Sequence, residues 1–183
     1  MAGWKDKRRV MHRYDLTADM YEERYAEEQH AKYRVALENV NMSGVVLDVG
    51  CGTGLFFSQV ASQVSMVVGV DISRKLLLKA KDKAKKLSKV FVLQADTDHL
   101  PFGEGFFDAV FAFTVLQNMP QPSETLRELK RVAKSGGSVV VTGLKKAFPL
   151  DTFMDVLEGT SLRVASFVDI ENSKCYVAVL SGQ

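Results

Sequence analysis

Five short apolar runs, rich in β-branched residues, recur along the chain and alternate with stretches in which apolar residues have helical spacing. The runs are VVLDV (45–49), MVVGV (66–70), VFVLQ (90–94), FDAVFAF (107–113) and SVVVTGL (138–144). Short runs that are apolar at successive positions are typical of strands buried on both faces. Strands that alternate with helices predict an α/β fold in which helices cover both faces of a parallel sheet.

The connections and the C-terminal end refine this prediction. Two stretches carry apolar residues on one helical face and are predicted to be crossover helices. Their apolar residues are Leu55, Phe56, Val60, Ala61 and Val64 in the first, and Leu76, Leu77, Ala80, Ala84 and Leu87 in the second. Near the C-terminus, RVASFVDIE and KCYVAVLSG are separated only by Asn172 and Ser173, the spacing of a hairpin. The parallel sheet is therefore expected to end in an antiparallel pair.

A chain of 183 residues, 46% of them hydrophobic, is long enough for one domain with a core. We expect a single domain over 1–183, with a charged helical segment over 1–40 appended to a core over 41–183. Lysine and arginine (24) nearly balance aspartate and glutamate (22), so the net charge demands neither a nucleic acid nor a membrane. Without a signal peptide or an apolar span, a cytoplasmic protein with no membrane partner is expected. Cys51 and Cys175 have no companions at metal-ligand spacing, so we expect plain thiols and no metal.

Three glycines follow the first predicted strand, in the string DVGCGTGLF. A glycine-rich turn between a strand and a helix brings bare main chain to the carboxyl edge of the sheet, where α/β folds bind ligands. A phosphate-binding P-loop needs a lysine after its last glycine, but Leu55 and Phe56 stand there. A dinucleotide fingerprint needs a third glycine where Leu55 stands. On the glycines alone, a cofactor loop and a tight turn are equal alternatives.

The G-x-G-x-G spacing, preceded by Asp48 inside the strand, resembles motif I of the class I S-adenosylmethionine-dependent methyltransferases. The resemblance covers residues 44–144 and continues through Asp71 after the second run, Asp96 after the third, and the strings LPF and FDAV. It implies a Rossmann-like seven-stranded sheet in the order 3-2-1-4-5-7-6, with strand 7 antiparallel and helices on both faces. It also implies that the chain is an enzyme, an S-adenosylmethionine-dependent methyltransferase.

By the same resemblance, particular residues are implied to bind the cofactor. The glycine loop with Asp48 would hold its methionyl part, Asp71 its ribose, and Asp96 with Thr97 its adenine; the alternative for each acid is an N-cap or a turn residue. Thr114 and its two predecessors would border the methyl group, with Gln117 nearby. The implied cofactor-binding residues are Asp48, Gly50, Cys51, Gly52, Gly54, Asp71, Ile72, Asp96, Thr97, Phe113, Tyr21 and Tyr25.

The last two of these residues lie in the N-terminal segment RRVMHRYDLTADMYEERYAEEQHAKY. This segment resembles the helix that covers the cofactor in quinone-biosynthesis and tRNA wobble-uridine methyltransferases. The likeness implies that Tyr21 or Tyr25 closes over the methionyl end and shapes the substrate entrance. The alternative is that these tyrosines only fix the helix to the sheet.

Methyl transfer from a sulfonium is an in-line displacement with a good leaving group, so alignment of the reactants supplies much of the rate. No residue is therefore predicted to be a catalytic acid or base. His99, in the string ADTDHLPF, is interpreted as a surface or packing residue, and Asp108 as structural. The segment FAFTVLQNMPQP lacks the Asn/Asp-Pro-Pro-Tyr/Phe motif of related enzymes that methylate amino-adenine or glutamine, so these substrates are not expected.

Only the segment KKAFPLDTFMDVLEG separates the fifth run from the C-terminal hairpin. We therefore expect an open site and a macromolecular acceptor, either tRNA, rRNA or a translation protein. RNA phosphates would meet the basic residues Lys5, Lys7, Arg8, Arg9 and Arg13. In the family's strand order, 90–94 is an edge strand, which predicts pairing with a small activator subunit. The alternatives are a small-molecule, quinone-like acceptor and a non-catalytic subunit that only binds the cofactor.

Overall fold

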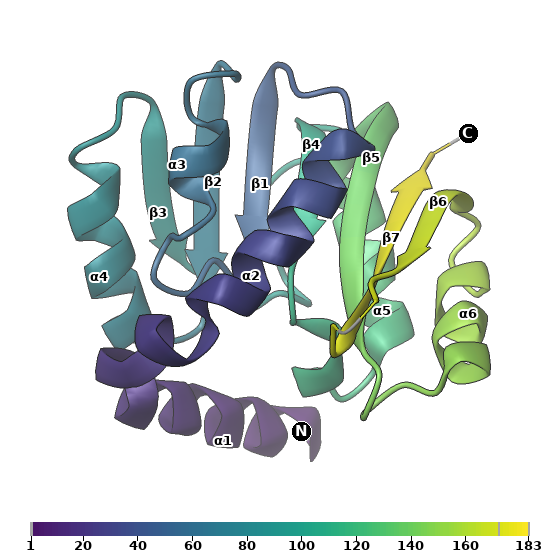
Figure 1. The fold of residues 1–183 in the computed structure, drawn as a ribbon, viewed down its shortest axis with the longest axis horizontal. Coiled ribbons are helices and arrows are strands. Elements are labelled where there is room, and N and C mark those ends of the chain that lie inside the picture. Colours follow the sequence, from purple (N-terminus) through teal and green to yellow (C-terminus); the bar gives the residue numbers. More distant parts are fainter. Residues whose placement is uncertain (1, 172, 183) are drawn as a thin grey trace.

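A seven-stranded sheet forms the centre of the molecule (Figure 1). The computed structural model describes residues 2–171 and 173–182. The strands are β1 (Val45–Val49), β2 (Met66–Asp71), β3 (Val90–Gln94), β4 (Phe107–Ala112), β5 (Ala133–Leu144), β6 (Arg163–Asp169) and β7 (Cys175–Ser181). Their order is β3-β2-β1-β4-β5-β7-β6, with β7 antiparallel to both of its neighbours and the other pairs parallel. The strand order and the antiparallel strand that the family resemblance implied are confirmed.

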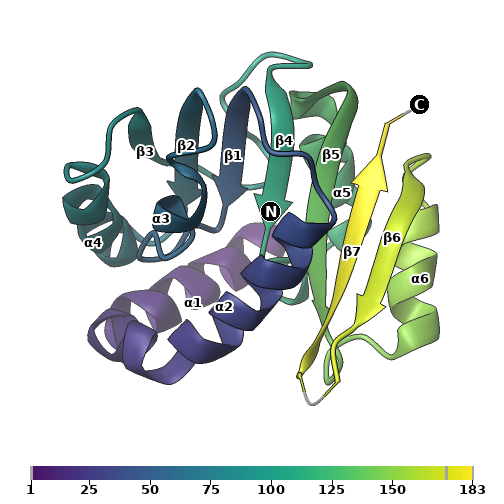
Figure 2. The ribbon, with the colours of Figure 1, turned by 45° about the horizontal axis from the view of Figure 1, so that its top comes forward.

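Helices lie on both faces of this sheet, as predicted. They are α1 (Ala2–Thr17), α2 (Tyr21–Glu38), α3 (Phe57–Val60), α4 (Arg74–Ala84), α5 (Pro122–Val132) and α6 (Leu150–Glu158), with 3-10 turns η1 (Ala18–Met20) and η2 (Leu116–Asn118). α2, α3 and α4 cover one face, and α5 and α6 cover the other. α1 runs across the carboxyl ends of the parallel strands, below the sheet in Figure 1 and beside α2 in Figure 2. In the described part of the chain, no helix has the length and apolar character needed to cross a lipid bilayer.

Successive residues of the interior strand β1 face opposite sides of the sheet. Val46 belongs to the core cluster that includes Tyr33 of α2 and the residues of α3 and α4. Leu47 belongs to the cluster that includes Leu126 of α5 and the residues of α6. Because both faces of the strand are buried, both sets of side chains are apolar. Asp48 is the exception in this strand, and it lies near the carboxyl edge.

The connection after the glycine loop differs from the predicted helix. We expected one helical face over 55–64, but α3 has only four residues. On either side the chain turns more tightly, with i→i+3 bonds such as the one from the amide of Gln63 to the carbonyl of Val60. Phe56 and Phe57 are both fully buried. Both rings join Val60 in the core cluster on this face of the sheet, so the apolar side of the connection is buried as predicted although the helix is short.

The C-terminal hairpin is present, and its connection is longer than predicted. β6 ends at Asp169 and β7 begins at Cys175, so residues 170–174 join the strands. Asn172, half of the predicted two-residue turn, lies outside the described residues. The antiparallel pairing itself runs from Arg163 opposite Ser181 to Asp169 opposite Tyr176.

Asp108 of β4 connects its strand to both neighbouring strands. Its carboxylate accepts a hydrogen bond from the amide of Val45 at 2.7 Å and pairs with Nζ of Lys134 at 2.7 Å. The ion pair with Lys134, followed by the bond from Val45, holds the pKa of Asp108 below its usual range. A Cβ at Gly44 would overlap this carboxylate, which explains the glycine there. These contacts agree with the structural interpretation of Asp108.

Candidate functional site

The glycine loop joins β1 to α3 at the carboxyl edge of the sheet. Gly50, Gly52 and Gly54 have φ angles of +67°, +57° and +76°, in the left-handed region that favours glycine. A Cβ at Gly50 would lie 2.6 Å from Cγ2 of Val115, so there is also no room for a side chain. The main chain is therefore bare and left-handed at all three positions, as the glycine pattern predicted.

Asp71, at the end of β2, is buried and hydrogen-bonded to this loop. Its Oδ2 accepts a hydrogen bond from the amide of Gly52 at 2.9 Å, and its Oδ1 accepts one from the amide of Ser73 at 2.8 Å. Burial raises the pKa of Asp71 to about 6, although the backbone donors act in the opposite direction. Each carboxylate oxygen keeps a further lone pair, so Asp71 can accept two more hydrogen bonds from a ligand.

Asp48 is a second buried carboxyl group at this edge. Burial raises its pKa well above the usual range, and the neighbouring Asp71 carboxylate adds to the shift. Within residues 2–171 and 173–182, no hydrogen-bond donor contributes to the environment of its carboxyl group. Its oxygens therefore keep their capacity to accept hydrogen bonds from a ligand. A cationic group of a ligand would stabilise the ionised form of Asp48 and donate a hydrogen bond to it. Asp48 is therefore suited to bind a cationic group.

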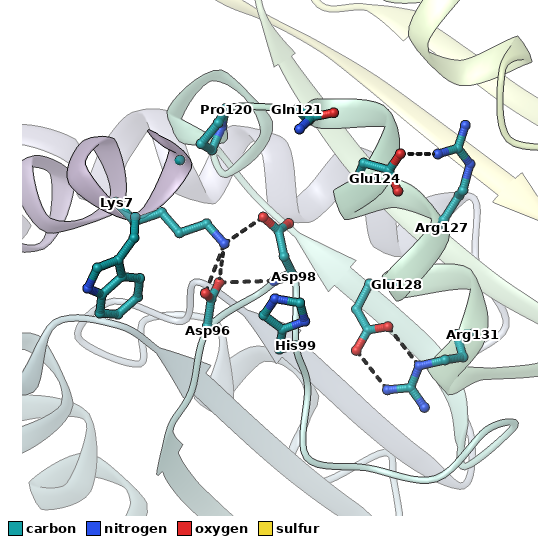
Figure 3. A pocket seen from close by; sticks show the side chains of 12 residues that line it. Lys7, Asp96, Asp98, His99, Pro120, Gln121, Glu124, Arg127, Glu128 and Arg131 are labelled. Atoms are coloured by element: carbon teal, nitrogen blue, oxygen red, sulfur yellow. Dashed lines mark hydrogen bonds and ion pairs between the residues drawn. The ribbon is translucent and has the colours of Figure 1, made fainter. Parts of the chain in front are cut away.

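Asp96 is engaged by a residue that the sequence did not indicate for this role. Nζ of Lys7, on α1, lies 2.7 and 2.8 Å from the carboxylate oxygens of Asp96 and 2.6 Å from Oδ2 of Asp98 (Figure 3). Burial acts to lower the pKa of Lys7, but the hydrogen bonds to both aspartates outweigh it and raise that pKa. The three side chains line a cavity of about 580 Å³, and His99 lines it with them. The pair of acids two residues apart was the one sequence signal for a cationic partner.

The basic cluster predicted to meet RNA does not form a single free surface. Lys7 is only 8% exposed because its ammonium group is held by the two aspartates. Arg13 donates to Oδ1 of Asn118 at 2.7 Å, and Arg9 pairs with Asp6 at 3.2 Å. The prediction was wrong for Lys7, because α1 packs onto the carboxyl edge of the sheet and turns this side chain inward.

The cavity at the glycine loop is narrow, about 60 Å³. Seven of the predicted cofactor-binding residues line it: Tyr21, Gly50, Gly52, Asp71, Ile72, Thr97 and Phe113. Pockets that enclose small organic ligands typically measure about 300–1,000 Å³, so this space is far smaller than such a pocket. The N-terminal segment narrows it, with Val10 and Tyr14 among the lining residues. A ligand the size of a nucleoside therefore enters only if this segment shifts.

The other five predicted residues lie around this cavity without lining it. Asp48 is buried in β1, and Asp96 lines the neighbouring cavity with Lys7. Gly54 faces the core, where a Cβ would lie 2.5 Å from the ring of Phe57. Cys51 is a buried free thiol whose pKa is raised by burial. Tyr25 lines a third, larger cavity.

Tyr21 and Tyr25 occupy different positions although they are one helical turn apart. A Cβ at Gly52 would lie 3.4 Å from the ring of Tyr21, so this ring covers the glycine loop. Burial raises the pKa of Tyr21, and Nε2 of Gln29 donates to its hydroxyl at 3.3 Å. Tyr25 is 41% exposed, and its ring centroid lies 5.2 Å from that of Tyr21. Of the two, Tyr21 is the residue positioned over the loop.

The third cavity has a volume of about 1020 Å³ and adjoins the narrow one. Tyr14, Tyr21, Thr114 and Asn118 line both cavities. Thr114, just after β4, has a φ of +62°, and its amide donates to Oγ1 of Thr142 at 2.7 Å. Nζ of Lys32, on α2, donates to Oγ1 of Thr114 at 3.0 Å. The arrangement places a large ligand space directly beside the glycine loop, with Thr114 at their junction.

No group of three or more His, Cys, Asp or Glu side chains with the arrangement of a metal site occurs in the described ranges. Cys175 is also a buried free thiol, and burial raises its pKa.

Comparison with known proteins agrees with this arrangement. A family model described as "Methyltransferase domain" matches residues 47–141, which include the end of β1, the glycine loop and all of β2, β3 and β4. Demethylmenaquinone methyltransferase of Bacillus licheniformis is 34% identical over 118 residues, covering 61% of this chain and 51% of that protein. The chain thus spans about half the length of the curated relatives it matches.

Two solved structures illustrate the shared fold. Magnesium protoporphyrin IX methyltransferase from Synechocystis, with bound S-adenosylmethionine, has a TM-score of 0.78 and 17% identity, covering 97% of each chain. A methyltransferase in complex with the Trm112 methyltransferase activator of Haloferax volcanii has a TM-score of 0.76 and 17% identity, covering 92% of this chain and 97% of that one. At these identities the likeness is one of fold.

Proposed function

The chain belongs to the methyltransferase domain family, whose cofactor is S-adenosylmethionine, and from this premise we propose that it transfers a methyl group to a small molecule. The observation that carries this proposal is the junction of two cavities. The narrow one contains the bare glycine loop and Asp71, and the large one, about 1020 Å³, meets it at Thr114. Donor and acceptor bound in adjoining spaces would be held in the alignment that an in-line displacement needs.

The glycine loop and the acidic residues beside it fit the cofactor in three respects. Bare main chain at Gly50 and Gly52 admits the methionyl part, and the unpartnered carboxyl group of Asp48 suits its ammonium group. Asp71 has lone pairs left for the two ribose hydroxyls. Asp96 and Thr97, after β3, are proposed to hold the adenine. When bound, the sulfonium supplies an electrophilic methyl group.

The N-terminal segment is proposed to close the site. Its tyrosines line both cavities, so a closed segment would exclude water and orient the acceptor toward the loop. Tyr21 would cover the methionyl end because its ring lies over Gly52. Lys7 would secure the closed position through Asp96 and Asp98.

We propose a small-molecule acceptor, whereas the sequence favoured a macromolecular one. That hypothesis relied on the short segment after β5, which leaves no inserted helices to enclose a substrate. Residues of α1 and α2, among them Tyr14 and Tyr25, line the large cavity, so these helices enclose it in place of inserted ones. The relative from Bacillus licheniformis is named for a small-molecule acceptor, which supports the same choice.

The test is transfer of a radiolabelled methyl group by the purified chain. We expect the label in a small-molecule fraction that contains lipid quinones and hydroxylated organic acids, and none in RNA or protein fractions. Label found only in RNA or protein would contradict the proposed acceptor. Label found nowhere, with intact binding of S-adenosylhomocysteine, would favour the alternative of a non-catalytic subunit that binds the cofactor.

Tyr21→Ala is expected to weaken the binding of S-adenosylhomocysteine about tenfold, since the ring that covers the glycine loop is lost. Tyr25→Ala is the matched control, because its partly exposed ring lines only the large cavity; we expect less than about a twofold change. Calorimetry measures both affinities, and circular dichroism verifies that both variants are folded. Equal losses in the two variants would contradict a specific role of Tyr21.

We also propose that a small activator subunit pairs with β3. This strand is at the edge of the sheet, and it exposes Phe91 (58%) and Leu93 (42%). An edge strand with exposed apolar side chains favours pairing with another chain. The Haloferax volcanii neighbour was solved with such an activator, which supports the proposal. Full turnover by a monomeric chain alone would contradict it.

A further inference from the structure

The large cavity is strongly basic. Six of its lining residues are basic: Arg13, Arg24, Lys32, Lys145, Lys146 and Lys174. Among the described residues, Glu28 is the one acidic residue that lines this cavity. Clefts lined by one sign of charge concentrate ligands of the opposite sign. We propose that this cavity binds a small organic acid that also carries a hydroxyl group. Its identity as the methyl acceptor rests on the proposed function.

The positive charge is not neutralised inside the protein. Glu28 lies 3.2 Å from Nζ of Lys32 and 3.7 Å from Nζ of Lys174, so one carboxylate faces two ammonium groups. Lys145 pairs with Asp169, outside the cavity wall. Across residues 2–171 and 173–182, Arg24 and Lys146 make no ion pair. The carboxylate of a bound ligand would offset part of this unpaired positive charge.

Lys32 adds a buried positive charge to the cavity wall, while its three N–H donors are accepted by Thr114, Gln29 and Glu28. It is only 2% exposed, yet it lines the cavity and donates to Oγ1 of Thr114 at the junction with the glycine loop. The phosphates of an RNA strand are flanked by sugars and bases, so they fit the exposed rim better than a buried ammonium group. The observations therefore favour a small acid over RNA.

Gln117 adds a second requirement. Its Nε2 donates to the carbonyl of Thr114 at 2.6 Å, which fixes the orientation of the amide. Its Oε1 is buried and has no hydrogen-bond partner. Such an acceptor needs a donor, because leaving it unpaired costs about 1–3 kcal/mol. A hydroxyl group on the ligand would supply that donor, and the rings of Tyr14 and Tyr25 would pack against a planar skeleton.

The test compares 3,4-dihydroxybenzoate with its neutral analogue, 3,4-dihydroxybenzamide, by calorimetry. Both are titrated into the chain alone and into the chain saturated with S-adenosylhomocysteine. We expect the acid to bind about tenfold more tightly than the amide, since only the acid makes charge-assisted contacts. Equal affinities, or no binding of either compound, would overturn the proposal.

Two double variants locate the effect. Arg24→Gln with Lys146→Gln removes two exposed rim charges and is expected to weaken binding of the acid about fivefold while leaving the amide unchanged. Lys81→Gln with Lys86→Gln makes the same charge change at exposed positions at and just after α4, and we expect no effect on either compound. An equal loss of affinity for the acid in both double variants would indicate a long-range effect of net charge and would contradict binding in this cavity.

A competition experiment tests the choice of a small ligand. Displacement of the acid by a single-stranded RNA oligonucleotide would overturn that choice.

The outcomes separate this proposal from the proposed function. Discrimination between acid and amide by a chain that does not bind S-adenosylhomocysteine would support the anion site and refute the methyltransferase function. Binding of S-adenosylhomocysteine and methyl transfer without such discrimination would support the function and refute the anion site.

Discussion

Asp71→Asn is expected to weaken the binding of S-adenosylhomocysteine about 100-fold at neutral pH. The carboxylate is proposed to accept hydrogen bonds from both ribose hydroxyls while it also holds the amides of Gly52 and Ser73. Hydrogen bonds to a charged group contribute about 1.5–3 kcal/mol each. Asparagine has one acceptor oxygen and no charge, so at least one ribose hydroxyl loses its partner. Calorimetry measures the change, and circular dichroism verifies the fold of the variant.

The affinity of the unmodified protein should also depend on pH. Burial raises the pKa of Asp71 to about 6, and the ribose hydroxyls require the ionised form. Affinity is therefore expected to be full above about pH 7 and to fall by up to about tenfold per pH unit below about pH 6. Asp48 is a second carboxyl group with a raised pKa in this region, so the Asp71→Asn variant isolates the contribution of Asp71. Identical pH profiles in the two proteins would contradict the assignment.

Gly54→Ala is expected to lower the free energy of unfolding by about 2–4 kcal/mol, without any ligand present. Gly54 has a φ of +76°, which costs a residue with a side chain about 1 kcal/mol or more. The added Cβ would lie 2.5 Å from the ring of Phe57 and 3.3 Å from Cα of Ala80. Phe57 is fully buried and the Ala80 atom belongs to the backbone of α4, so neither moves away easily.

Urea unfolding of the ligand-free protein measures this change. Gly103→Ala is the control, because a Cβ there meets no atom within 4 Å and its φ is not in the left-handed region. We expect the control to change stability by less than about 0.5 kcal/mol. A Gly54→Ala variant as stable as the control would show that the loop relaxes at no cost, and the structural explanation of the third glycine would fail.

The sequence by itself determined the sheet and the position of the glycine loop. The runs at 45–49 and 90–94 coincide with β1 and β3. β1 is apolar because both of its faces are buried, whereas β3 keeps an apolar run although Phe91 and Leu93 are exposed at the edge of the sheet. The glycines at 50, 52 and 54 identified the left-handed loop, since few other residues adopt such φ angles. The order of motifs identified the family, and the family implied the strand order.

Only the tertiary structure decided how the N-terminal helices meet the sheet. Lys7 pairs with Asp96 across 89 positions, and Lys32 bonds to Thr114 across 82 positions. Both helices mix many charged residues with scattered aromatic and aliphatic ones, and this spacing does not say which charged side chains turn inward. The basic residues were therefore interpreted as an RNA surface, whereas Lys7 is buried and Arg13 lines a cavity. The patterns of strands and turns depend on residues that are near neighbours in the chain, so the sequence shows them directly. A cavity lined by α1, α2 and the ends of β4 and β5 exists only once these distant elements pack together.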